Sequence, residues 1–94
     1  MPRSYQGPAA PNVKIRRQLH TEILDRGRII QASDTQITLL EADGTTPVIE
    51  IDGSTIITFG ARRVSAVKLR RGLYAETLVI DAGAAVRVKV SRRP

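Results

Sequence analysis

The chain has 94 residues, with 15 Lys or Arg against 9 Asp or Glu and no cysteine. This length allows a single domain, and the lack of cysteine excludes disulfides and thiolate metal sites. No window approaches the ~18 apolar residues of a membrane-spanning helix, and the first residues lack the apolar region of a secretory signal. We therefore expect a protein without a membrane span, located in the cytoplasm or in a virion.

Charge is divided into three blocks along the chain. Residues 1–28 contain six basic and two acidic groups, residues 29–61 contain five carboxylates and no Lys or Arg, and residues 62–94 contain nine basic and two acidic groups. A uniformly basic chain would indicate a nucleic-acid partner. A basic–acidic–basic chain can also complement copies of itself or a larger protein.

The first segment, residues 1–12, is rich in Pro, Gly and Ala and predicts an extended arm without internal hydrogen bonds. We expect this arm to dock on a partner, with the contact residues Pro2, Arg3, Tyr5, Pro8 and Pro11. A single β domain is expected over residues 13–90, followed by a basic tail over residues 91–94.

Residues 13–24 fit two structures. Their apolar positions follow a period of two that Arg17 interrupts, but Ile15, Leu19 and Ile23 also have helical spacing. A long strand is favoured, because a hairpin turn at residues 25–27, ending in Gly27, would pair it with the next run.

The remaining chain consists of short runs rich in Ile, Val and Leu, which favour strands. Turn signals separate them, and Asp43-Gly44 is the best candidate for a type I′ hairpin turn. Strands are predicted at residues 28–32, 36–41, 47–51, 55–59, 73–80 and 86–90, whereas residues 62–71 fit either a strand or a short helical connector. The fold class is all-β: a small five- to six-stranded antiparallel barrel or a sandwich.

Several of these segments resemble small bacterial OB-like barrels from domain families of unknown function. The similarity is carried by Gly27-Arg28-Ile29, Asp34, Ile37-Thr38-Leu39, residues 51–56, the step from Leu69 to Gly72, and the alternating valines of residues 86–90. It covers residues 27–90 and implies a closed sheet of five or six strands, with no known chemistry.

The sequence offers few groups for catalysis. His20 is the only histidine and has no cysteine with which to share a metal, so an ordinary surface role is expected. Glu50 and Asp52 would share the solvated face of one strand, with Ile49 and Ile51 turned to the core. Asp43 and Asp81 are expected to form turns. We therefore predict no enzyme activity, no metal and no cofactor.

Basic residues are the main candidates for binding. Arg-Arg doublets at turns or in tails can serve one surface, whereas doublets in strands cannot. The residues predicted to contact an acidic partner are Arg62, Arg63, Lys68, Arg70 and Arg71, with Tyr74 as a possible platform for stacking on bases. Arg87 and Lys89 would share a face of the last strand and would suit the protection of a sheet edge.

These features predict a structural or assembly module that docks on a larger protein assembly, such as a virion decoration or connector subunit, or on copies of itself. The acidic middle block and the arm favour this role. The alternative is a small barrel that binds nucleic acid without sequence specificity, through phosphate contacts.

Overall fold

The computed structural model describes residues 20–94, and within them the chain is all-β, as predicted. The docking-arm residues Pro2, Arg3, Tyr5, Pro8 and Pro11, together with residues 13–19, lie outside the described part. The strands are β1 (Glu22–Ala32), β2 (Gln36–Leu40), β3 (Val48–Glu50), β4 (Ile56–Phe59), β5 (Arg62–Val64), β6 (Tyr74–Ile80) and β7 (Arg87–Ser91). One turn of 3₁₀ helix, η1 (Ala66–Lys68), connects β5 to the loop before β6.

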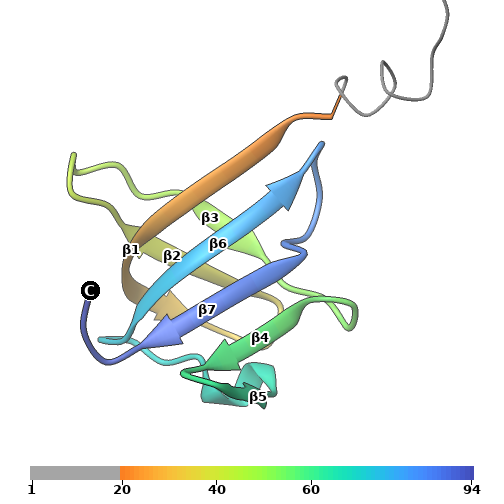
Figure 1. Cartoon of the computed structure of the whole chain (residues 1–94). Helices are drawn as coiled ribbons and strands as arrows, with labels where there is room; N and C mark the ends of the chain where they lie inside the picture. Colours follow the sequence, from red (N-terminus) through yellow and green to blue (C-terminus); the bar gives the residue numbers. More distant parts are fainter. Residues whose placement is uncertain (1–19) are drawn as a thin grey trace, which may run out of the picture.

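All seven strands belong to one sheet, with the order β3-β2-β1-β6-β7-β4-β5. Neighbouring strands are antiparallel except β4 and β7, which pair in parallel. The sheet curls strongly, so that β1, β6, β7 and β4 lie side by side and β2 and β3 lie behind them (Figure 1). It therefore differs from the predicted five- to six-stranded antiparallel barrel: residues 62–64 add a strand, the sheet is mixed, and the ladder does not close.

The curled sheet comes closest to closing where β3 ends. The amide of Ala85 donates to the carbonyl of Glu50, and the hydroxyl of Thr55 donates to the carbonyl of Ala85 at 2.6 Å. Ile56 follows by donating its amide to the carbonyl of Val86. The loop before β7 thus bridges the end of β3 and the start of β4 without adding a rung to the ladder.

Strand β1 is longer than the sequence predicted. Its register with β6 runs without interruption from Glu22 to Arg28, so the turn predicted at residues 25–27 is wrong. Gly27 is needed here for a close approach rather than for a turn, because a Cβ atom at this position would lie 2.4 Å from the carbonyl oxygen of Leu40. A register shift between Ile29 and Gln31, typical of a bulge, then bends the strand as it continues along β2.

The core lies inside the curl and is made of aliphatic side chains from almost every strand. Fully buried side chains include Ile29 of β1, Leu39 of β2 and Val88 of β7. Alternation along each strand turns every second residue inward. Ile49 and Ile51 are buried, as predicted, and Phe59 packs against the edge of the core.

Two local predictions need correction. Strands β2 and β3 form the predicted hairpin, but only Gly44 has a positive φ, so Asp43-Gly44 is not a type I′ turn, which requires a positive φ at both residues. Arg87 and Lys89 do not guard an edge, because β7 is paired on both sides, with β6 and with β4. The segment 62–71 contains both predicted alternatives, a strand followed by a short helical turn.

The contact at Gly27 generates a stability prediction. Replacing Gly27 with Ala forces a methyl group against the backbone of Leu40, so we expect a loss of roughly 1–3 kcal/mol in the free energy of unfolding. Urea denaturation followed by circular dichroism measures it.

Gly53→Ala is the matched control, because no heavy atom lies within 4 Å of a Cβ at that position. Equal stability of the two variants would contradict the importance of the close approach.

Candidate functional site

The candidate site is the outer face of the sheet, the side of β1, β6, β7 and β4 that faces away from the core. The strand registers arrange its side chains in three parallel rows that run across the strands. The rows are two residues, or ~7 Å, apart along each strand. The first contains Ile56, Arg87, Leu78 and Leu24; the second Thr58, Lys89, Glu76 and Arg26; the third Ser91, Tyr74, Arg28 and Leu40.

The first row, called the apolar row below, is unusual for a solvated sheet face. Leu24 is 64% exposed and Ile56 is 42% exposed, while Leu78 between them is half-buried. Arg87 is the only charged member of this row. Large apolar side chains gathered on one exposed face are typical of contact surfaces.

The second row carries a chain of charges. Glu76 lies between Arg26 and Lys89, with nitrogen–oxygen distances of 3.9 Å to each. Because these groups are exposed and the contacts are long, they add little to stability. Their effect is to leave both cations of this row with a carboxylate neighbour.

The third row lines a hollow of about 610 Å³. Tyr74 is half-buried on its floor, with Arg28 opposite it on β1 and Leu40 beyond on β2. Glu41 and Pro94 also line the hollow, as do Arg26, Glu76 and Lys89 of the second row. The hollow therefore combines an apolar floor with several charged side chains.

The residues predicted to contact a partner do not all come together. Arg62 and Arg63 lie on β5, Lys68 on η1, and Arg70 and Arg71 in the loop that follows; all five are exposed. Because Arg62 and Arg63 are neighbours in a strand, their side chains leave opposite faces, contrary to the prediction that this doublet lies at a turn.

Of the predicted residues that the structure describes, only Tyr74 lines the hollow, while Arg63 lies opposite Thr58 and extends the second row onto β5. Sequence reasoning missed Arg26 and Arg28. The sequence signal for them was their spacing: Arg26 and Arg28 flank Gly27, and in a strand this places both side chains on one face. Because a turn was predicted at residues 25–27, no strand was expected there.

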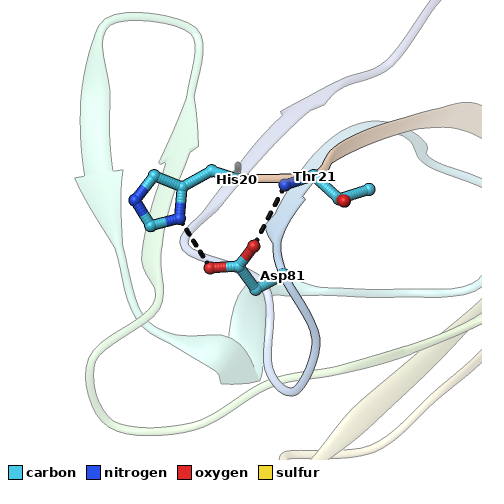
Figure 2. Close-up of polar contacts among 3 residues, drawn as sticks. All are labelled: His20, Thr21 and Asp81. Atoms are coloured by element: carbon cyan, nitrogen blue, oxygen red, sulfur yellow. Dashed lines mark hydrogen bonds and ion pairs between the residues drawn. The ribbon is translucent and has the colours of Figure 1, made fainter. Parts of the chain in front are cut away.

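His20 and Asp81 form the clearest side-chain contact of the described residues (Figure 2). His20 Nδ1 lies 2.7 Å from Asp81 Oδ2, and the amide of Thr21 donates to Asp81 Oδ1 at 3.0 Å. The hydrogen bond from Thr21, followed by that from His20, lowers the pKa of Asp81. Asp81 has a φ of 67°, which fits the predicted role as a turn former. The contact ties the start of β1 to the end of β6.

Two acidic side chains, those of Asp25 and Glu41, interact where β1 passes the end of β2. A side-chain hydrogen bond with Glu41 raises the pKa of Asp25 to about 6, with desolvation and the charge of Glu41 as further causes. Glu41 Oε2 is buried and has no hydrogen-bond partner in the described part of the chain, while its Oε1 accepts from the hydroxyl of Thr45. Protonation of Asp25 therefore removes the repulsion between the two carboxylates.

The remaining carboxylates do not form a metal site. No group of three or more His, Cys, Asp or Glu side chains suited to a metal ion occurs in residues 20–94. Asp52 accepts from the amide of Ser54 and closes the turn after β3, so it does not share a strand with Glu50 as predicted. Among the same residues, no helix has the length and hydrophobicity to cross a membrane.

The comparisons with known proteins found no match: no protein-family model, no curated protein and no solved structure is similar to this chain. Inferences about function therefore depend on the geometry of the outer face and on the charges around it.

The pair formed by Asp25 and Glu41 predicts a pH dependence of stability. Because the folded-state pKa of Asp25 is raised to about 6 from 3.8, its contribution is fully present below pH 3.8 and is lost as pH rises to about 6. Asp43 and Asp81, whose pKa values are lowered, act in the opposite direction below that range.

We expect Asp25→Asn to remove this loss, since an amide neither titrates nor repels Glu41. The measurement is the free energy of unfolding in urea between pH 4 and pH 7 for both proteins, which share the same His20. The wild type should lose stability relative to the variant across this range. Parallel pH profiles would contradict the raised pKa of Asp25.

Proposed function

We propose that this chain is a non-enzymatic assembly module that docks a protein partner through the outer face of its sheet. The observation that carries the proposal is the apolar row, with Leu24 and Ile56 exposed on the same face as the hollow around Tyr74. An isolated exposed leucine needs no explanation, but a row of apolar groups beside an open hollow favours contact with another protein.

The charge of this face favours an acidic partner. It carries five basic side chains, Arg26, Arg28, Arg63, Arg87 and Lys89. On the same strands, Glu22 and Glu76 are its acidic members. A partner surface that combines apolar groups with carboxylates would complement it, and such complementarity mainly sets specificity and association rate.

Non-specific nucleic-acid binding receives less support. A polyphosphate laid over the hollow would meet Glu76 between its two cations and Glu41 at the wall. Within residues 20–94, Tyr74 is the single aromatic residue lining the hollow, whereas single-strand binders stack successive bases on several rings. Phe59 does not help, because it packs against the core.

The proposed setting is a larger protein assembly, such as a virion in which the chain is a decoration or connector subunit. The arm of residues 1–12 is the second proposed contact, and Arg62, Lys68, Arg70 and Arg71 form an exposed basic segment available to the same partner. Copies of the chain are one candidate partner.

The proposal predicts that the apolar row controls association. In size-exclusion chromatography with light scattering, we expect wild-type protein at high concentration to elute at a multiple of 10.3 kDa. Leu24→Thr combined with Ile56→Thr should shift it to the monomer, because Thr retains strand preference while removing apolar surface.

Val67→Thr is the matched control, since Val67 is 72% exposed but lies on η1, away from the outer face. It should leave association unchanged. A monomeric wild type that binds oligothymidylate at low salt and releases it at high salt would contradict the proposal and favour nucleic-acid binding.

A further inference from the structure

We infer that the partner of the outer face is a second copy of this chain, which presents Val48 and Glu50 of its strand β3 to the hollow. In this contact Glu50 pairs with Arg28, and Val48 packs beside Tyr74 and Leu40. The inference rests on the proposed docking function and names its occupant.

Arg28 is the cation of the hollow that has no carboxylate partner among the described residues. Arg26 and Lys89 both have Glu76 as a neighbour, whereas Arg28 forms no ion pair with any of the described residues. Arg28 is exposed at the rim beside the half-buried ring of Tyr74. A guanidinium next to an aromatic and an aliphatic side chain suits a carboxylate that carries an apolar neighbour, because guanidinium groups bind carboxylates through two parallel hydrogen bonds.

The overall charge of the hollow favours a single carboxylate over a polyanion. Its cations are Arg26, Arg28 and Lys89, and its acidic groups are Glu41 and Glu76. The carboxylates of Glu41 and Glu76 would repel a chain of phosphates. A single glutamate can pair with Arg28, the cation of the hollow without a carboxylate partner among the described residues.

Most carboxylates of the chain are already occupied. Glu41 pairs with Asp25, Asp43 accepts from Thr45, Asp52 from Ser54, Glu76 lies between two cations, and Asp81 accepts from Thr21 and His20. This leaves Glu22, Asp34 and Glu50 as available groups.

Glu50 is the available carboxylate with the right surroundings. Glu22 belongs to the outer face itself, and Asp34 lies between Ser33 and Thr35 in a loop. Glu50 is exposed on β3, two residues from Val48, which is 56% exposed.

Both side chains of this pair leave the same face of β3, because Ile49 between them is buried in the core. They are ~7 Å apart along the strand.

The contact is heterologous, because it joins two different surfaces of the same chain. After two copies pair, the dimer retains one free hollow on one copy and one free Val48–Glu50 pair on the other, so copies add head to tail and form a ring or a filament. The charge segregation fits this contact, because residues 29–61, which include β3, contain no lysine or arginine that would repel the cations of the hollow.

Charge reversal tests this arrangement with the full-length chain. Arg28→Glu and Glu50→Arg should each abolish association, giving monomers of 10.3 kDa in light scattering. A 1:1 mixture of the two variants retains one native pair, Arg28 of one variant with Glu50 of the other. The substituted positions of the two variants form a second pair of opposite charges with the signs exchanged, so the mixture should form larger assemblies again. The double variant, with both charges reversed in the same chain, should form larger assemblies again.

Asp34→Arg is the matched control, because it reverses an exposed charge outside the contact. It should associate like the wild type. Circular dichroism of every variant establishes that it is folded.

Three results would overturn the inference: a monomeric wild type, association that survives Arg28→Glu, or a mixture that stays monomeric. Loss of association on changing Leu24 and Ile56, together with survival of Arg28→Glu, would retain the docking function and reject the Arg28–Glu50 contact. Association unaffected by either change would reject both.

Discussion

The close approach of β1 to the end of β2 is the constraint on which the rest of the structure depends. Gly27 allows the backbone of β1 to pass against the carbonyl of Leu40, where any side chain would collide with it. β1 can then pair with β6 along its first half and with β2 along its second half, bending at the shift after Ile29. This one strand joins both halves of the curl and encloses the aliphatic core between them.

The same arrangement produces the outer face. Because all seven strands belong to one curled sheet, the core takes the inward side chains, and the opposite face of β1, β6, β7 and β4 remains accessible (Figure 1). Strand registers then bring together residues from distant parts of the sequence, such as Arg26, Glu76 and Lys89. The hollow around Tyr74 is a consequence of these registers and of Pro94, which borders it.

Composition and alternation were sufficient to predict the fold class and most of the strands. The stretches of β-branched residues from Gln36 to Phe59 and from Leu73 onward became strands within one or two residues of the predicted limits. The turn predicted at Gly27 was wrong, because the sequence does not distinguish a glycine that permits a close backbone approach from one that forms a turn. The parallel pairing of β4 with β7 could not be predicted either, since it depends on which strand edges the curl brings together.

The candidate site was only partly predictable for the same reason. Tyr74 was identified, but Arg28 and Leu40 join it only through the register of β1 with its two neighbours. The basic doublets were predicted to contact a partner because of their sequence pattern. The side chains of Arg62 and Arg63 nevertheless point to opposite faces, because both residues lie in a strand. The sequence shows the charge segregation directly. Its proposed use at Val48 and Glu50 could not be predicted from the sequence, because it depends on which carboxylates already have partners in the folded chain.

The most direct test of the central claim, that the outer face is a protein-docking surface, is ¹⁵N-resolved NMR of the chain from dilute to concentrated solution. The account predicts concentration-dependent shifts at the outer-face residues of β1, β6, β7 and β4 and, for docking between copies, on β3 as well. The core-facing residues should change little. Shifts confined to Lys68, Arg70 and Arg71, with none on the outer face, would contradict it, as would a spectrum that is independent of concentration but responds on the outer face to oligothymidylate.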